Sequence, residues 1–264
     1  MRKQLFGTAL ILFVSVTLVV YLWGPAEEML TIVGNVAQTL AGLLSAVMLF
    51  RTASAFTRTD AAKPYWTWLS VGYLFNALGF VIYAWSELVL GLEVPTPSLA
   101  DLFWVLTYPA LLFGTFGMMR LYATSGLAVE INKLSWVAGA AVFLVAGYFL
   151  MLPIITSDAG WLEKVTLLAY PLFDAVLFAA SISIALMMRQ FGVGKLGAPW
   201  TFIALGMIAV AGADMIYTYL SAQGLYETGN LVDLGWVLQG ALVAWGGALQ
   251  YRLVKGEDVS GRVA

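Results

Sequence analysis

The sequence predicts an all-α integral membrane protein: eight transmembrane helices, forming two parallel four-helix repeats, with both termini in the cytoplasm. Three observations support this: the hydropathy, the placement of the basic residues and an internal match. Hydrophobic residues make up 61% of the chain and charged residues 11%, and the mean hydropathy is +0.88. A soluble domain is about 25% charged. We therefore expect a multi-pass protein of the cell (inner) membrane, surrounded by the lipid bilayer.

Eight apolar runs are long enough to cross a bilayer, which takes roughly 20 residues of helix. They are 5–23, 31–50, 66–90, 100–119, 134–153, 165–188, 199–221 and 231–250. The first run has no Ala-x-Ala-like cleavage site and ends in Tyr21 and Trp23, so we expect a retained span and not a signal peptide. Short loops favour antiparallel neighbours in one bundle. This gives a membrane domain over 1–253, with halves 1–125 and 126–253, and a short cytoplasmic tail over 254–264.

The basic residues fall on one side of this arrangement. Twelve of the 13 Lys and Arg lie at the two termini or in alternate loops, and Lys164 alone lies on the other side. The twelve are Arg2, Lys3, Arg51, Arg58, Lys63, Arg120, Lys133, Arg189, Lys195, Arg252, Lys255 and Arg262. Because cytoplasmic loops carry the excess of Lys and Arg, both termini are predicted to be cytoplasmic and the number of spans even.

The second half of the chain repeats residues of the first half in order. At one constant offset, Trp66, Thr67, Gly72, Ile82 and Tyr83 match Trp200, Thr201, Gly206, Ile216 and Tyr217. After a small loop difference, Asp101, Leu102, Trp104, Val105, Leu106, Gly114 and Arg120 match Asp233, Leu234, Trp236, Val237, Leu238, Gly246 and Arg252. A unit of four helices keeps its orientation when repeated, so we predict parallel repeats about an axis along the membrane normal.

Missing residue types exclude several kinds of chemistry. The chain has no cysteine and no histidine. The first absence excludes disulfides and thiolate chemistry, and the second removes the usual haem ligand, zinc ligand and general base. A net charge of −2 gives no sign of nucleic-acid binding. We expect no cofactor, and the sequence leaves a metal site undecided.

Two aspartates interrupt predicted spans. Asp174 falls near the middle of the sixth span and Asp214 in the outer half of the seventh. A charged aspartate at the bilayer centre costs roughly 2.5–3.5 kcal/mol, so such residues usually face the bundle interior, where they pair or function. The alternative is a neutral, protonated aspartic acid that bonds a neighbouring helix and only holds the bundle together. We expect both side chains to face a hollow open to the outside.

Two prolines suggest how this hollow forms. Pro171 follows Tyr170 and leaves the Leu167 carbonyl without its helical partner, and Pro109 follows Tyr108 in the same way in the fourth span. Such kinks are also ordinary packing devices. The residues predicted to bind a ligand are Asp174, Asp214, Asn76, Tyr217, Tyr108, Tyr170, Gln38 and Glu87. The residues predicted to be structural are Pro109, Pro171, Asp101, Asp233 and Trp236.

Other polar and small-residue signals have simpler interpretations. Asp101 and Asp233 each open a span, where a carboxylate caps free N–H groups. Glu87 lies near the outer end of the third span, and its simpler interpretation is a side chain that reaches the membrane interface. FGVGKLG (191–197) has the glycine spacing of a nucleotide loop, but no strand precedes it. Gly240, Ala244 and Ala248 form a small-xxx-small stripe suited to close helix packing within or between chains, which leaves a homo-oligomer open.

The segments PSLADLFWVLTYPALLFG (97–114), YPLFDAVLF (170–178) and ADMIYTYLSAQGLYETGNLVDLGWVLQGAL (213–242) resemble a known kind of module. They are similar to the multi-helix membrane input domains found N-terminal to bacterial and archaeal diguanylate cyclases and sensor histidine kinases. The resemblance covers roughly residues 60–250. Its motif residues fall on Asp101, Tyr108, Pro109, Tyr170, Pro171, Asp174, Asp214, Tyr217, Asp233 and Trp236. It implies importance for these positions but assigns them no chemistry.

The first functional hypothesis is a sensory or regulatory module, not an enzyme, that detects an external or membrane-borne cue and signals to a cytoplasmic protein. No cyclase or kinase domain follows Arg252, which leaves a separate partner, a longer parent chain or another role. The second hypothesis is a transporter of protons, cations or small amines through the interface between repeats. An intramembrane enzyme acting on lipid and a structural subunit of a membrane assembly complete the alternatives.

Overall fold

The computed structural model describes residues 2–24, 26–92, 94–124, 133–189 and 197–256. All regular secondary structure within these ranges is helical, as the sequence predicts. The predicted tail (254–264) and the glycine loop (191–197) lie outside the described residues, except for 254–256 and Gly197.

The helices are longer than the predicted spans at most of their ends. They are α1 (Arg2–Trp23), α2 (Glu27–Ala55), α3 (Lys63–Leu88), α4 (Leu99–Thr124), α5 (Lys133–Ala146), η1 (Gly147–Met151), α6 (Leu152–Thr156), α7 (Trp161–Arg189), α8 (Ala198–Ala222) and α9 (Asp233–Val254). Pro64 and Pro199 lie in the first turns of α3 and α8, where the missing N–H has no helical acceptor to lose.

Seven of the eight predicted spans are helices long and apolar enough to cross a membrane. One of these seven is built from three segments, α5, η1 and α6, and runs over Trp136–Thr156. The eighth, α9, has 22 residues, and its role as a span stays a prediction. The protein is thus a multi-pass membrane protein by the length and composition of its helices.

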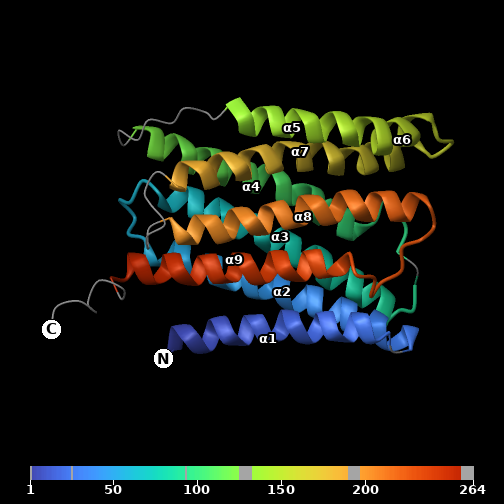
Figure 1. Cartoon of the computed structure of the whole chain (residues 1–264), viewed down its shortest axis with the longest axis horizontal. Coiled ribbons are helices and arrows are strands. Elements are labelled where there is room, and N and C mark those ends of the chain that lie inside the picture. The colour runs from blue at the N-terminus through green and yellow to red at the C-terminus, as the bar shows by residue number, and fades with distance from the viewer. Residues whose placement is uncertain (1, 25, 93, 125–132, 190–196, 257–264) are drawn as a thin grey trace.

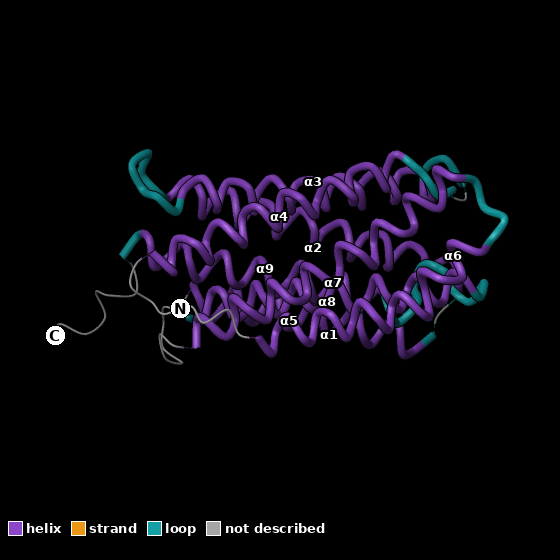
Figure 2. Tube along the Cα trace, turned by 90° about the horizontal axis from the view of Figure 1, so that it is seen from above, coloured by secondary structure: helices purple, strands orange, loops and turns teal. Residues whose placement is uncertain are grey.

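Six of the helices pack as a closed ring. Neighbours around the ring are α2 and α3, α3 and α4, α4 and α7, α7 and α8, α8 and α9, and α9 and α2. Figures 1 and 2 show these long helices running side by side, with α1 and α5 at opposite edges in Figure 1. Only 17% of the α1 window and 22% of the α5–α6 window are buried, against 39–61% for the other spans. The ring therefore forms the core, and α1 and α5 are exposed on its outside.

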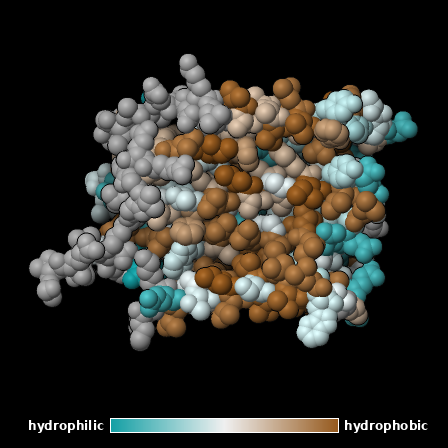
Figure 3. Space-filling model, in the orientation of Figure 1, coloured by the Kyte–Doolittle hydropathy of each residue, from teal (hydrophilic) through white to brown (hydrophobic). Residues whose placement is uncertain are grey.

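The two ends of the bundle differ in charge. One end, called the acidic end below, carries Glu27, Glu28, Glu87, Asp101, Asp158, Glu163, Glu227 and Asp233. The other, called the basic end, carries Arg51, Arg58, Lys63, Arg120, Arg252 and Lys255. In Figure 1, α1 begins and α9 ends at the basic end, on the left. On the face seen in Figure 3, hydrophobic residues cover the middle, and hydrophilic ones gather at the acidic end.

The ring interior is packed with large side chains toward the basic end. Trp66 and Trp200 are both fully buried, and their ring centroids lie 4.9 Å apart. Leu69, Met118 and Ile203 are also almost completely buried in this half. These side chains occupy the space between the helices at the basic end of the ring. The open volume lies in the other half.

Candidate functional site

The site is a cavity of about 320 Å³ inside the acidic half of the ring. All six ring helices line it, and Ile154 of α6 completes the wall. Thr96, Glu163 and Ser221 lie at its loop end, and Leu111 and Leu177 at its inner end. Its aromatic lining residues are Phe80, Tyr83, Trp104, Tyr108, Tyr170, Tyr217, Tyr226 and Trp236. Its polar lining also includes Asp101, Glu163, Asp214, Gln38, Asn76 and Gln239.

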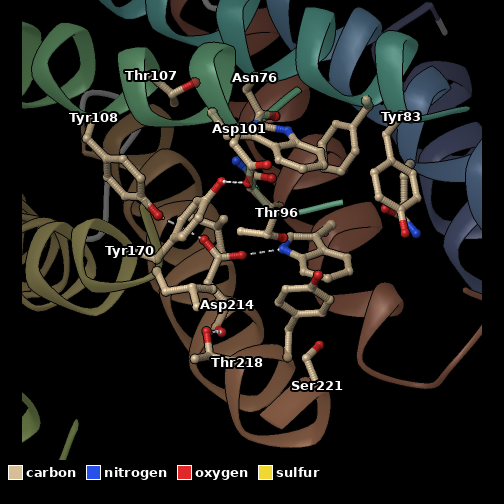
Figure 4. Close-up of a pocket in the computed structure, with 18 of the residues that line it drawn as sticks. Asn76, Tyr83, Thr96, Asp101, Thr107, Tyr108, Tyr170, Asp214, Thr218 and Ser221 are labelled. Carbon is tan, nitrogen blue, oxygen red and sulfur yellow. Dashed lines mark hydrogen bonds between the residues drawn. The ribbon is translucent and has the colours of Figure 1, made fainter. Parts of the chain in front are cut away.

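Asp174 and Asp214 are joined by Tyr108. The Tyr108 hydroxyl, on α4, lies 2.8 Å from Oδ1 of Asp174 on α7 and 3.0 Å from Oδ2 of Asp214 on α8. Trp236 Nε1, on α9, donates to Asp214 Oδ1 at 2.6 Å. Figure 4 shows Tyr108 and Asp214 pointing toward one another, with Tyr170 beside them. Four helices are thus tied together by one chain of polar side chains.

The two aspartates differ in their access to the cavity. Asp214 lines it, whereas Asp174 is 0% exposed and lies behind Tyr108, outside the lining. Oδ2 of Asp174 has no hydrogen-bond partner among the described residues. The expected meeting of two acids in a hollow is therefore indirect: one acid faces the cavity, and a tyrosine separates it from the other.

Asp101 has a structural role and also a contact to the site. Ser98 precedes α4 and donates to Asp101 Oδ2 from its backbone N–H and its hydroxyl, both at 2.7 Å, while the Asp101 N–H donates back to the Ser98 hydroxyl at 3.3 Å. This is a capping box at the start of α4. The other oxygen, Oδ1, accepts a 2.6 Å hydrogen bond from the Tyr170 hydroxyl on α7. Asp101 thus fixes both its own helix start and a wall of the cavity.

Asp233 does not cap α9, contrary to the expectation for a helix-opening carboxylate. It is the first residue of the helix, and its carboxylate accepts from the Gly229 N–H at 2.8 Å and from the Tyr226 hydroxyl at 3.0 Å, both in the preceding turn. Gly229 has φ 98°, and an added Cβ would lie 2.7 Å from the backbone of Leu30. Only glycine fits this turn, which Asp233 holds against α2.

Glu87, predicted to bind a ligand, lies outside the cavity lining. Its carboxylate accepts a 2.5 Å hydrogen bond from Asn35 Nδ2 on α2 and a 3.0 Å bond from the Thr228 hydroxyl. These bonds tie α3 to α2 and to the loop before α9. Glu87 therefore belongs with Asp233 to a structural cluster at the acidic end.

Aromatic rings connect this cluster to the cavity. The centroids of Tyr217 and Tyr226 lie 4.5 Å apart at 84°, and those of Tyr217 and Trp236 lie 5.5 Å apart at 65°. Edge-to-face packing of this kind fixes ring positions. Trp236, predicted to be structural, packs against the rings of Tyr217 and Tyr226, and its N–H donates to Asp214. The prolines Pro109 and Pro171 lie inside α4 and α7, each directly after a cavity tyrosine.

Several buried polar atoms in the lining lack partners within the described part of the chain. They are Asn76 Oδ1, Trp104 Nε1, and Nε2 and Oε1 of Gln239. Asn76 is 6% exposed and Gln239 is 1% exposed. The Tyr73 hydroxyl lies next to the Gln239 amide, but the two groups are not oriented for a hydrogen bond of good geometry. Because a buried polar group without a partner is costly, these atoms mark where the protein can bind a polar group.

Sequence reasoning missed Gln239, Trp104, Tyr83 and Tyr226 as lining residues. The internal match could have found two of them, because Trp104 and Tyr83 match Trp236 and Tyr217, which were singled out. Gln38, Asn76, Tyr108, Tyr170, Asp214 and Tyr217 were singled out for binding and do line the cavity.

Among the described residues, no group of three or more Asp, Glu, His or Cys side chains is arranged to hold a metal ion. The arrangement instead offers separated carboxylates, amides and aromatic rings around one volume. Comparison with protein-family models, with curated proteins and with solved structures finds no match for this chain. The resemblance to sensor input domains therefore stays a prediction from the sequence motifs.

Proposed function

We propose that this chain is a sensory membrane module that binds a small ligand in the ring cavity and signals by helix movement to a cytoplasmic partner. The observation that carries the proposal is that one cavity is lined by all six ring helices. A ligand there contacts every helix of the core at once. Its binding energy can therefore favour one packing arrangement of the ring over another.

The course of the helices supports signalling toward the basic end. Lining residues on α3, α4, α8 and α9 lie in the acidic half, and each of these helices continues to the basic end. Packed helices shift by roughly 1–2 Å as rigid elements in many switching proteins. Under the predicted orientation the basic end is cytoplasmic, so a shift there would be presented to a partner protein.

Equivalent contacts in the two halves support the proposed parallel repeats. A Cβ on Gly114 would lie 2.7 Å from Leu69, and one on Gly246 would lie 2.7 Å from Ile203, the residue that matches Leu69. Gly72 and Gly206, which also match, are packed against α4 and α9 respectively. Trp66 touches its own counterpart Trp200. We infer an axis between these two tryptophans, with a movement that rotates one half against the other.

A transporter of protons or small cations is the second candidate, favoured by the Asp174–Tyr108–Asp214 bridge. A hydroxyl has one hydrogen, so two carboxyl oxygens at hydrogen-bond distance need a second proton between them. Proton-linked transport uses such groups. In the basic half, large buried side chains, with Trp66 against Trp200, pack between the helices on the far side of the cavity, and this favours the sensor.

Spin labels can test for the movement, because the chain has no cysteine of its own. The double variant Arg120→Cys/Lys255→Cys places labels on two exposed positions near the basic ends of α4 and α9. Small cationic, neutral and anionic aromatic compounds are first screened for binding in nanodiscs by their effect on Tm. A compound that binds is expected to shift the label-to-label distance by roughly 1–2 Å.

The same compounds are tested for uptake by liposomes that contain the protein. Binding with a distance shift and without uptake supports the sensor. Uptake that depends on Asp214 would support the transporter instead. Binding that leaves the label distances unchanged would contradict the sensory proposal.

A further inference from the structure

We propose that the ligand of this cavity is a small organic cation, an amine or quaternary ammonium that carries apolar groups. The inference rests on the proposed function in that it uses the same cavity as a ligand site. It adds a chemical class, which the sensory role alone does not specify. Four features of the lining support it.

The first feature is charge. Asp101, Glu163 and Asp214 line the cavity, and none of the lysines and arginines in the described part of the chain does. Lys164 is the one basic residue at the acidic end within the described ranges, and its Nζ donates to the Ile155 carbonyl at 3.0 Å, away from the lining. Acidic side chains around the entrance raise the local concentration of cations and repel anions.

The second feature is the aromatic wall. Tyr170, Tyr217, Tyr226 and Trp236 line the cavity together with Asp214. Aromatic faces attract cations, and a cage of several rings is the usual protein site for quaternary ammonium groups. Rings also bury the apolar substituents of such a ligand. A carboxylate set among rings is thus suited to an organic cation, whereas a metal ion needs several oxygen ligands within reach of one point.

The third feature is the unused bonding capacity of Asp214. Asp214 Oδ1 accepts a hydrogen bond from Trp236 Nε1, and Oδ2 lies 3.0 Å from the Tyr108 hydroxyl, which Asp214 shares with Asp174. A carboxylate has about four acceptor sites, so Asp214 can still accept from an ammonium N–H. Its two protein partners hold the carboxylate in place before a ligand arrives. Such preorganisation strengthens binding.

The fourth feature is the pair of amides in the lining, which gives the ligand a second polar contact. Asn76 Oδ1 is buried in the lining and unpartnered in the described structure, and the buried Gln239 amide, beside the Tyr73 hydroxyl, makes no hydrogen bond of good geometry there. They suit a hydroxyl or carbonyl group on the ligand. The volume of about 320 Å³ lies at the lower end of the range for small-molecule sites, roughly 300–1,000 Å³.

Three probes of similar size and different charge test the inference. They are benzyltrimethylammonium, N,N-dimethylbenzamide and benzenesulfonate, titrated by calorimetry into the protein in zwitterionic nanodiscs, with empty nanodiscs as the blank. Benzyltrimethylammonium is expected to bind roughly tenfold or more tightly than the other two. This comparison uses the unaltered protein and needs no variant to fold.

Variants then locate the binding. Asp214→Asn is expected to weaken benzyltrimethylammonium binding roughly tenfold or more, because it removes the charge that the cation meets. Tyr217→Leu should weaken it several-fold, whereas Tyr217→Phe keeps the ring and most of the affinity. Glu87→Gln is the matched control, since it removes a carboxylate at the same end but outside the lining. Its affinity should stay within about twofold of the unaltered protein.

The outcomes separate the two proposals. The cation inference is overturned if the neutral or the anionic probe binds as tightly as the cation or more tightly, or if Asp214→Asn leaves cation binding unchanged. The sensory role still stands in that case if the probe that binds shifts the spin-label distance. Cation binding as expected with unchanged label distances supports the inference and contradicts the sensory role.

Discussion

Tyr108 is the residue on which the geometry of the site depends. Its single hydroxyl hydrogen can serve Asp174 or Asp214 at one time, although both carboxyl oxygens lie within 3.0 Å. The bridge is therefore complete only when a second proton lies on one of the two acids. Asp214 retains Trp236 as a partner without Tyr108, whereas Asp174 would have none among the described residues. Asp174, the fully buried acid, thus depends on Tyr108 more than Asp214 does.

Tyr108→Phe should lower the free energy of unfolding by about 1–3 kcal/mol, since it leaves a buried carboxyl group without a partner. Adding Asp174→Leu should recover much of that loss, because both partners are then replaced by apolar groups of similar shape. Unfolding by SDS in mixed micelles measures the four species of this cycle. If the losses in unfolding free energy of the two single variants add up to the loss of the double variant, the hydroxyl and the carboxyl group are not coupled.

At single positions the sequence indicated which residues belong to the site, but it did not indicate whether each side chain points into the cavity. A carboxylate within an apolar run signals an inward position, and Asp214 does line the cavity. Glu87 and Gln239 gave no such guide, because helices that are apolar on all sides have no polar face from which direction could be read. Asp174 lies behind Tyr108 for a reason of three-dimensional packing that spacing along the chain does not encode.

At the level of elements, hydropathy predicted the helices well and their local irregularities poorly. The run over 134–153 is not one regular helix: Gly147–Met151 is a π-helical segment, in which the Leu152 N–H bonds the Gly147 carbonyl. Pro153 follows directly and has no N–H to give to the preceding turn, so the wider turn shifts the ladder by one residue. Pro153 is visible in the sequence, whereas the π-helical segment before it, which packs against α7 and α8, is not.

The small-residue stripe of α9 packs within the chain, against α2. A Cβ on Gly240 would lie 2.6 Å from the backbone of Ala41, and the Thr52 hydroxyl of α2 donates to the Gly247 carbonyl at 2.8 Å. Close backbone approach is the usual basis of helix association in membranes. The contact closes the ring, because α2 and α9 are the neighbours from opposite halves of the chain.

Gly240→Ala should therefore lower stability by about 1–3 kcal/mol, because the clashing atoms belong to backbone and cannot turn aside. Gly212→Ala is the matched control: Gly212 lies inside α8, and an added Cβ there has no neighbour within 4 Å. Alanine at that position should be neutral or stabilising by up to about 1 kcal/mol. Thermal unfolding of both variants in the same detergent compares them, and equal changes would argue against close packing of α9 on α2.

At the scale of the whole molecule, the ring explains why hydropathy alone leaves α9 undecided. A helix that faces lipid must be apolar outside, and the two most hydrophobic spans are α1 and the span built from α5, η1 and α6. In contrast, α9 packs between α2 and α8, and its Asp233, Trp236 and Gln239 are buried inside the protein. Polar side chains are tolerated where they face the bundle interior. With 22 residues, α9 is about 33 Å long, enough to cross the hydrocarbon core.

Cysteine labelling in whole cells tests both the crossing and the orientation of the molecule. Glu227→Cys and Lys255→Cys place single exposed thiols at the two ends of α9, and Arg58→Cys marks the loop between α2 and α3. A membrane-impermeant maleimide should label Glu227→Cys in intact cells, and the other two only after permeabilisation, because basic segments stay in the cytoplasm. The cysteine-free parent gives the background.

Labelling of Glu227→Cys and Lys255→Cys from the same side would mean that α9 does not cross the membrane. Labelling of Arg58→Cys in intact cells would reverse the orientation and place the cavity mouth in the cytoplasm.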